Sequence, residues 1–180
     1  MVIYRTLAEP AVQGTIFVRQ VFMMNNDYQS AYYASEIGIF KITGSNAGIH
    51  ALEFTDETKL PEQAVPVCLK DCFAQLDEYF AGKRKAFQLN LEPEGTAFQQ
   101  AVWQQLLKIP YGRTSTYLDV AKALGKPKAI RAVGAANGRN RIPIIIPCHR
   151  VIGSNGALIG FGGGLWRKEF LLKHEKALLV

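Results

Sequence analysis

A cysteine, a histidine and an arginine stand side by side in this chain as Cys148, His149 and Arg150, directly after the apolar run 142–147. A cysteine thiolate is a strong nucleophile, and cationic neighbours stabilise it relative to the thiol. Two prolines in the apolar run fix the backbone and remove donors. We therefore expect a buried, extended strand with irregular ends that stops at Cys148. Successive strand side chains point to opposite faces, so contact between Cys148 and His149 requires a bend or a bridging water.

The competing interpretation of Cys148 is an inert core thiol, because free cysteine is among the most buried residue types. Two basic groups directly after the thiol favour chemistry over packing. The other two cysteines, Cys68 and Cys72, lie four residues apart. They could hold half of a zinc site, but no further ligands are apparent, so we expect core packing and no metal. We also expect His50 to be structural. An odd number of cysteines without a secretory signal predicts free thiols in a reducing compartment.

The first half of the chain has the pattern of a small antiparallel sheet followed by a helix. Runs 14–24, 30–42 and 49–54 are rich in β-branched and aromatic residues, and 43–48 has the composition of a hairpin loop. Apolar residues at helical spacing predict a helix over 66–80, with Gly82 as its stop. The polar, breaker-rich segment 82–95 predicts a connection between two domains.

Helix signals dominate the second half. Two pairs have capping-box spacing: Thr96 with Gln99, and Thr116 with Asp119. We expect the first helix to continue to Pro110. The second helix should stop at Gly125, and a third should begin near Ala129, which gives a helix-turn-helix. A last helix is expected from Leu165 to about Ala177.

The helix expected from Ala129 carries almost only small side chains. Glycine inside a helix costs about 1 kcal/mol relative to alanine, so Gly134 suggests close approach by another group. That group could be a neighbouring helix, or a nucleic-acid backbone with Arg131 as the one long cationic probe. Both interpretations stay open. The glycine-rich stretch 160–164 lacks the features of a phosphate-binding loop, and is better suited to close approach of the backbone to a flat ligand.

The net charge of +6 is unevenly distributed. Residues 1–91 hold 8 Lys and Arg against 10 Asp and Glu, a balance of −2, whereas residues 92–180 hold 13 against 5, a balance of +8. A basic second half predicts a polyanionic partner, most simply nucleic acid, although a solvated basic surface is a common alternative. The chain has no signal peptide and no apolar run long enough for a bilayer, so we expect a soluble cytoplasmic protein without membrane contact.

The segment 147–151, preceded by the apolar run and by residues 131–134, closely resembles the active-site signature of the O6-methylguanine-DNA methyltransferases. The resemblance extends from Thr96 to about Glu175, and the first half resembles the ribonuclease-H-like partner domain of that family. It implies an α+β fold with two domains. These are an N-terminal ribonuclease-H-like antiparallel sheet with a helix at 1–91, and a C-terminal winged-helix-like domain with a helix-turn-helix at 92–180.

The resemblance implies irreversible, single-turnover repair of O6-methylguanine, with O4-methylthymine as a further candidate substrate. Cys148 would accept the alkyl group, His149 would take the thiol proton through a water, and Glu175 would orient the imidazole. Tyr117 would donate a proton to the guanine ring and crowd its phosphate, and Asn140 would brace the turn that holds the cysteine. The thioether product has no good leaving group, so the protein should act once.

The resemblance also implies a DNA-binding set and a base pocket. Arg131 would fill the gap left by the flipped base while the small-residue helix enters the minor groove. The implied DNA-binding residues are Arg131, Tyr117, Ala132, Gly134, Ala135 and Arg150. The implied pocket for the substrate base consists of Val151, Phe161, Gly162 and Cys148. Phe161 stands where many relatives have tyrosine, and Gly162 where some have serine. The zinc ligands of some animal members have no match.

The expected partner is double-stranded DNA with alkylated bases. We expect the protein to be a monomer without a cofactor, and to be associated with the nucleoid in a bacterium or with the nucleus in a eukaryote. Two other classes remain open. One is a lesion-binding DNA protein without methyl transfer. The other is a Cys-His hydrolase or thiol redox enzyme built on Cys148, His149 and Glu175, which would leave the basic helix-turn-helix unexplained.

Overall fold

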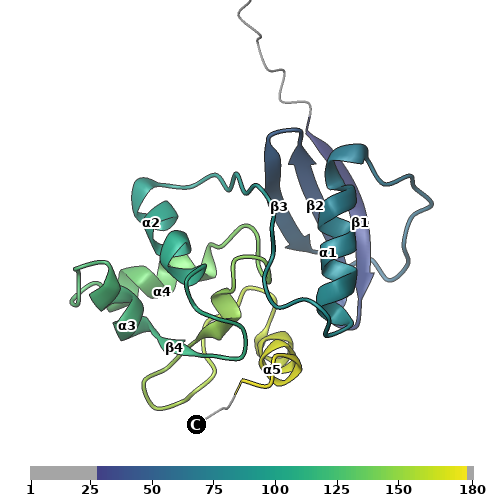
Figure 1. The fold of residues 1–180 in the computed structure, drawn as a ribbon. Helices are drawn as coiled ribbons and strands as arrows, with labels where there is room; N and C mark the ends of the chain where they lie inside the picture. The colour runs from purple at the N-terminus through teal and green to yellow at the C-terminus, as the bar shows by residue number, and fades with distance from the viewer. Residues whose placement is uncertain (1–27, 178–180) are drawn as a thin grey trace, which may run out of the picture.

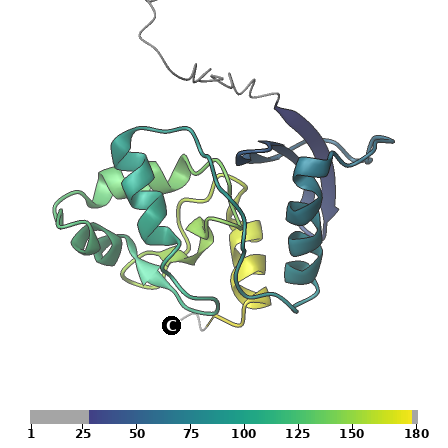
Figure 2. The same cartoon turned by 45° about the horizontal axis from the view of Figure 1, so that its top comes forward.

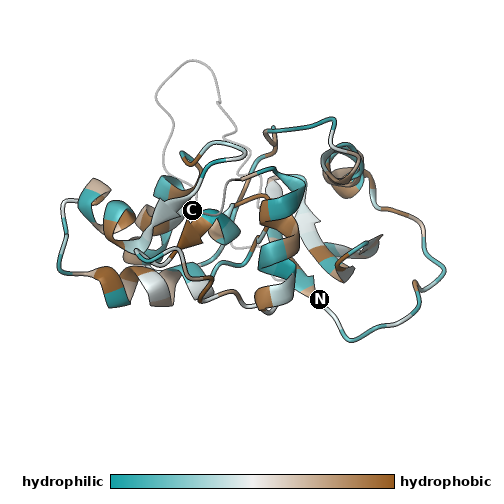
Figure 3. Ribbon diagram, turned by 90° about the horizontal axis from the view of Figure 1, so that it is seen from below, coloured by the Kyte–Doolittle hydropathy of each residue, from teal (hydrophilic) through white to brown (hydrophobic). Residues whose placement is uncertain are grey.

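The computed structural model describes residues 28–177. An N-terminal antiparallel sheet with one helix packs beside a C-terminal helical unit (Figure 1). The strand expected over 14–24 lies outside the described residues. Helices of both units carry hydrophobic as well as hydrophilic residues (Figure 3), as expected for helices that are half buried.

The sheet has the strand order β1-β2-β3, with β1 at Gln29–Ser35, β2 at Gly38–Ser45 and β3 at Gly48–Phe54. Both pairings are antiparallel, so the predicted sheet is confirmed. The run 30–42 contains two strands, because the chain turns at Glu36 and Ile37 and enters β2 at Gly38, whose φ of +113° suits glycine. Most of the predicted hairpin loop pairs instead: β2 runs to Ser45, so only Asn46 and Ala47 turn.

The predicted helix of the first half is present as the 3-10 turn η1, Val67–Leu69, followed by α1, Lys70–Phe80. Gly82 ends it as predicted, with a φ of +70° and its N–H donated to the Tyr79 carbonyl at 2.9 Å. Helix α1 lies against the sheet (Figures 1 and 2), and Cys72 is fully buried in the core between them. The packing prediction for Cys72 is therefore confirmed.

The helical unit begins with α2, Ala97–Leu106, and both predicted capping boxes are present. Helix α2 ends four residues before Pro110, so the proline follows the helix and does not end it. The helix-turn-helix consists of α3, Tyr117–Ala123, and α4, Ile130–Gly138, with Gly125 at φ +68° between them. The remaining elements are β4 Ser115–Thr116, the 3-10 turn η2 Cys148–Arg150, β5 Val151–Ile152 and α5 Leu165–His174. Strands β4 and β5 form a short parallel pair.

The prediction of an extended strand over 142–147 is wrong, although the segment is buried as expected. It forms a tight turn in which the Ile146 N–H donates to the Ile142 carbonyl at 2.9 Å, and Ile144 adopts a φ of +75°. Asn140 holds the turn closed: its Nδ2 donates to the Ile146 carbonyl at 2.8 Å, and its Oδ1 accepts from the Ile142 N–H at 3.0 Å. Prolines at 143 and 147 cannot donate to a ladder, so a side chain outside the run satisfies its backbone.

The two units meet through main-chain and side-chain bonds. The Leu52 N–H of β3 donates to the Arg141 carbonyl at 2.8 Å, and α5 packs beside α1 (Figure 2). His174 Nε2 donates to the Tyr79 carbonyl at 2.7 Å, which joins the C-terminal ends of α1 and α5. Across residues 28–177, none of the helices has the length and apolar character needed to cross a membrane.

Candidate active site

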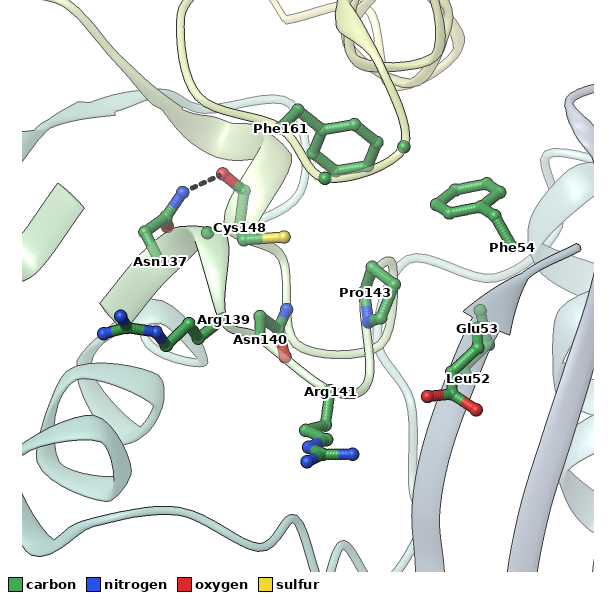
Figure 4. A pocket seen from close by; sticks show the side chains of 13 residues that line it. Leu52, Glu53, Phe54, Asn137, Arg139, Asn140, Arg141, Pro143, Cys148 and Phe161 are labelled. Atoms are coloured by element: carbon green, nitrogen blue, oxygen red, sulfur yellow. Dashed lines mark hydrogen bonds between the residues drawn. The ribbon is translucent and has the colours of Figure 1, made fainter. Parts of the chain in front are cut away.

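Cys148 points into a cavity of about 240 Å³ at the junction of the two units (Figure 4). Three segments wall this cavity: the end of α4 with the following turn, the glycine-rich loop 161–163, and β3 of the sheet. The ring of Phe161 lies next to the Cys148 sulfur, and the ring of Phe54 stands farther along the same cavity. The two rings meet edge to face with centroids 6.1 Å apart. A thiol thus faces a hollow with aromatic walls, which suits a flat ligand.

The thiol is held at the start of a 3-10 turn rather than at the end of a strand. Cys148 is 4% exposed, its N–H donates to the Ile146 carbonyl at 2.8 Å, and its carbonyl accepts from Asn137 Nδ2 at 3.4 Å. Burial raises the pKa of the Cys148 thiol to about 11, against the opposing effects of a hydrogen bond from Asn140 and the charge of Lys168. The resting group is therefore a thiol, and its reaction needs a base.

Glu175 is the acceptor around which the cationic groups of the site gather. Its Oε1 accepts from His149 Nε2 at 2.7 Å, from Arg150 Nη2 at 3.0 Å and from Tyr79 Oη at 2.8 Å. Its Oε2 accepts from Arg150 Nε at 2.8 Å and from the Gly112 N–H at 3.3 Å. Burial alone would raise the pKa of Glu175, but the hydrogen bond from His149 and the hydrogen bonds and charge of Arg150 hold it well below its ordinary value. The carboxylate is charged at any pH near neutrality.

His149 is fully buried, and its two ring nitrogens have different partners. Nε2 lies against the Glu175 carboxylate, which only accepts, so Nε2 carries the proton. Nδ1 is buried without a hydrogen-bond partner among the described residues. Burial lowers the pKa of His149 below its usual value, against the opposing effect of Glu175. The resting imidazole is therefore neutral, with a lone pair on Nδ1 that can take a proton.

Arg150 is buried in this structure, whereas the resemblance implies a contact with DNA. It is 6% exposed, it donates twice to Glu175, and its Nη1 donates to the Ile109 carbonyl at 2.6 Å. A bidentate arginine-carboxylate pair of this kind fixes geometry. In this structure the Arg150 guanidinium is therefore engaged inside the protein.

Tyr117 and Lys168 lie on the other side of the cysteine. Tyr117 Oη donates to the Ile159 carbonyl at 2.9 Å, and burial raises the pKa of Tyr117 to about 12, so the phenol stays protonated. Lys168 is fully buried on α5 and donates to the carbonyls of Val151 at 2.6 Å and Ile159 at 2.5 Å. Burial lowers the pKa of Lys168 to about 8. This lysine ties the strand that follows Cys148 to the loop beside the cavity.

The residues expected to form the base pocket do not all reach the cavity. Cys148, Phe161 and Gly162 line it, whereas Val151 is fully buried behind it. The expected DNA-binding helix α4 exposes Arg131, Ala132 and Ala135, and buries Val133 and Ala136 on its opposite side. A Cβ at Gly134 would meet the Tyr117 ring at 3.8 Å, an ordinary contact distance. The small residues thus form an outer face of α4.

Several neighbours of the site escaped the sequence reasoning: Phe54, Tyr79, Asn137 and Lys168. Asn137 had a local signal, because it is a polar side chain on a helix whose other side chains, apart from Arg131, are small or apolar. Lys168 follows Arg167 near the start of the last helix, and nothing in its sequence neighbourhood marks it as buried. Phe54 and Tyr79 belong to the other unit, and only the fold brings them here.

In the part of the chain that the structure describes, no group of three acidic, histidine or cysteine side chains is placed to hold a metal ion.

Comparison with known proteins gives matches over both units. Residues 97–177 match the family model described as 6-O-methylguanine DNA methyltransferase, DNA binding domain, and residues 29–93 match the ribonuclease-like domain of the same enzyme. A methylated-DNA–protein-cysteine methyltransferase of Methanosarcina barkeri is 48% identical over 149 residues, which cover 79% of this chain and 93% of the relative. One from Mycobacterium leprae is 49% identical over 146 residues, 79% of this chain and 88% of the relative.

The fold matches as well. A crystal structure of the O6-methylguanine methyltransferase of Mycobacterium tuberculosis has a TM-score of 0.75 at 42% identity, covering 83% of this chain and 93% of that one. A crystal structure of the Mycobacterium tuberculosis protein in complex with DNA has a TM-score of 0.74 at 43% identity, over 83% of this chain and 92% of that one.

Proposed function

The chain belongs to the 6-O-methylguanine DNA methyltransferase family, and we propose that it repairs alkylated DNA by moving the alkyl group onto its own Cys148. Its activity is that of a methylated-DNA–protein-cysteine methyltransferase, with DNA as partner and direct reversal as the mode of repair. The observation that carries the choice of acceptor is the placement of the Cys148 thiol in the cavity, with the His149–Glu175 pair directly behind it.

The transfer is a single displacement at the methyl carbon. The bond from sulfur to carbon forms while the bond from carbon to O6 of guanine breaks. The thiol proton passes through a water to Nδ1 of His149, which has no hydrogen-bond partner among the described residues and so keeps a lone pair for it. Glu175 stabilises the resulting imidazolium through Nε2 at 2.7 Å. A fixed carboxylate next to the imidazole is useful because both groups are buried, and separating charge costs more in a buried site than in water.

Tyr117 returns a proton to the purine as O6 leaves. Its pKa is raised to about 12, so it enters the reaction as a proton donor. The hydroxyl has to turn from the Ile159 carbonyl to the base for this step. The proton held by His149 then re-protonates Tyr117 through solvent, so the net exchange is one methyl group for one proton. Asn140 holds the 142–146 turn closed and thereby fixes the cysteine in line with the methyl carbon.

Helix α4 is the element that we propose enters the DNA minor groove. Its exposed residues Arg131, Ala132 and Ala135 combine one long cation with side chains small enough for close approach to the groove walls. Tyr117 and Gly134 lie directly under this face. The chemistry requires an extruded nucleotide because O6 is enclosed in the duplex, and Arg131 would occupy the gap in the stack. Arg150 is left out of this set because its guanidinium is used inside the protein.

The flipped base would stack on Phe161 and meet the backbone of Gly162, with Cys148 at the alkyl carbon. Val151 contributes through its main chain, whose carbonyl is held by Lys168. We include O4-methylthymine as a candidate substrate. The same proposal includes two domains, at 1–91 and 92–180, and a monomeric protein. It also includes action in the reducing compartment that holds the DNA. A thioether has no leaving group that any neighbouring side chain could activate, so each molecule acts once.

The test is methyl transfer from duplex DNA that carries O6-methylguanine labelled in the methyl group. The proposal expects close to one equivalent of label per protein, located on the Cys148 peptide by mass spectrometry. Cys148→Ala should retain none, and Cys68→Ala should behave like the wild type because Cys68 lies in the sheet unit away from the cavity. Repeating the assay with fresh DNA should give no second turnover.

Two results would contradict the proposal. DNA binding without label on the protein would favour a lesion-binding protein and leave the cysteine unused. Repeated turnover on an ester, peptide or peroxide, with loss of activity in Cys148→Ala, would favour a thiol hydrolase or redox enzyme. A separate measurement distinguishes DNA binding from chemistry: DNA affinity should depend steeply on salt concentration, and this dependence should be the same in Cys148→Ala as in the wild type.

A further inference from the structure

Tyr79 reaches the catalytic network from the other unit of the protein. It lies on α1, which packs on the sheet, and its side chain is fully buried. Its hydroxyl donates to Glu175 Oε1 at 2.8 Å across a sequence separation of 96 residues. Burial and the Glu175 charge raise the pKa of Tyr79 well above its usual value, so the group is a constant donor. The sheet unit thus supplies one of the hydrogen bonds that fix the carboxylate.

The oxygen that accepts from Tyr79 is the one that accepts from His149. Oε1 takes hydrogen bonds from Tyr79, His149 and Arg150, and a carboxylate of two oxygens offers about four lone-pair positions in all. With three donors, this oxygen has no spare capacity. Donation by Tyr79 therefore weakens the pull of Glu175 on the His149 proton. It also prevents the carboxylate from rotating away from the imidazole.

Tyr79 is itself held in place from both units. Its carbonyl accepts from His174 Nε2 at 2.7 Å, and its ring lies among the rings of Phe80, Phe87 and Tyr111 with centroid distances of 5.3, 5.4 and 6.3 Å. His174 directly precedes Glu175 at the end of α5. Docking α1 on α5 therefore sets the position of the hydroxyl and of the carboxylate together. The hydrogen bond between Tyr79 and Glu175 therefore orients the carboxylate, since both side chains are already held in place by other contacts and lose little conformational freedom when the bond forms.

We propose that Tyr79 is a positioning residue for methyl transfer, through which the sheet unit sets the orientation and basicity of the Glu175–His149 pair. This inference rests on the proposed function of Cys148. Without the hydroxyl, Oε1 binds the His149 proton more strongly and the imidazole becomes more basic, while the carboxylate gains freedom to rotate. The first effect moves the acid limb of the pH–rate profile to higher pH, because His149 must be neutral to act. The second effect lowers the rate.

Tyr79→Phe tests the inference, with Tyr33→Phe as matched control. Tyr33 is also a buried tyrosine packed with α1, and its hydroxyl donates to Asp77 at 2.9 Å, away from Glu175. Single-turnover methyl transfer is measured between pH 5 and pH 9, together with melting temperature and DNA affinity. Tyr79→Phe should transfer about tenfold more slowly, the lower end of the usual cost of removing such a support, with the acid limb moved upward. Tyr33→Phe should match the wild-type rate and profile, although both variants lose some stability.

A double-mutant cycle with Glu175→Gln separates positioning from general destabilisation. If Tyr79 acts through Glu175, the pair of substitutions should be no slower than Glu175→Gln alone. The inference is overturned if the two rate losses multiply, or if Tyr79→Phe keeps the wild-type rate and profile. A wild-type protein that takes no methyl onto Cys148 would instead refute the proposed function, and that result is read from the wild type before any variant is compared.

Discussion

Replacing Lys168 by methionine removes a buried cation from the neighbourhood of Cys148 while keeping the length of the side chain. Two effects on the reaction follow. The Lys168 charge lowers the pKa of the Cys148 thiol, so the variant thiol is harder to deprotonate. The carbonyls of Val151 and Ile159 also lose their shared donor, which releases the loop beside the cavity from the strand that follows the cysteine. Both effects slow methyl transfer, and we expect a loss of at least about tenfold.

The effect of the same change on stability should be small, because two terms oppose each other. Two buried carbonyls without a donor cost about 1–3 kcal/mol each. Against this, burial of the lysine is itself unfavourable: its pKa falls from 10.5 to about 8, which corresponds to roughly 3 kcal/mol near neutral pH. Methionine relieves that burden. The free energy of unfolding should therefore lie between about 1 kcal/mol above and about 3 kcal/mol below that of the wild type, and the variant should fold.

The assay is single-turnover methyl transfer with urea unfolding and DNA binding at several salt concentrations on the same preparations. Lys173→Met is the matched control, because Lys173 lies on the same helix, is exposed, and pairs only with exposed Glu169 at 2.6 Å. The salt dependence of DNA binding should be unchanged in Lys168→Met, since a buried lysine releases no counterion. A folded Lys168→Met protein that transfers within about twofold of the wild type would refute the role given to the charge.

Three further predictions concern the pocket wall, the turn and the pH dependence of stability. Gly163→Ala places a Cβ in collision with the ring of Phe54, whose other surroundings include the Arg167 guanidinium at 4.5 Å from the ring centroid. The loop must therefore move, and methyl transfer should slow several-fold. A rate equal to that of the wild type, with the fold unchanged by circular dichroism, would argue against a rigid wall. Asn140→Ala removes both side-chain bonds to the 142–146 turn and leaves only its backbone bond. The substitution should lower the urea midpoint by the equivalent of about 2 kcal/mol and slow transfer, while DNA affinity stays the same. An unaltered midpoint would show that the turn closes without Asn140. The folded-state pKa values of Glu175 and His149 lie below their ordinary values, so both groups bind fewer protons in the folded than in the unfolded state. The stability that they contribute at pH 7 should decline from about pH 6.5 downward for His149 and from about pH 4.5 downward for Glu175. Below pH 4.5 the stability of Glu175→Gln, already lower by about 3–5 kcal/mol at pH 7, should depend less on pH than that of the wild type, and parallel curves there would contradict the assignment.

Local signals allowed the helix boundaries to be predicted well. The Thr96–Gln99 and Thr116–Asp119 pairs act within one turn of the chain, and Gly82 and Gly125 adopt the left-handed backbone that their places after a helix indicate. The antiparallel sheet likewise followed from residue types and turn composition. Such signals depend on neighbours in the sequence, so no knowledge of the fold is needed to use them.

The turn over 142–147 shows where local reasoning fails. Prolines and β-branched residues argue against a helix, and the remaining choice between a strand and a turn depends on what satisfies the backbone. That partner is the side chain of Asn140, whose amide acts as both donor and acceptor inside the loop. Asn140 was expected to brace the turn from the resemblance alone. The residues next to Asn140 in the sequence do not indicate that its side chain forms two hydrogen bonds with the backbone of the isoleucine-rich run.

Burial of charge was the other feature that the sequence did not reveal. Lysine is almost never fully buried unless it is paired, so an alternation of charged and apolar residues on α5 favours an exposed Lys168. In the fold its ammonium finds two carbonyls, 17 and 9 residues away in the sequence. The same holds for Glu175, which takes donors from residues 79, 112, 149 and 150. The cysteine, histidine and arginine are adjacent in the chain, but the carboxylate that makes them a catalytic group is held by three separate segments. A perturbation of the α1–α5 contact should therefore affect the chemistry before it affects DNA binding, because α4 packs mainly on α2 and α3 and leaves its outer face exposed.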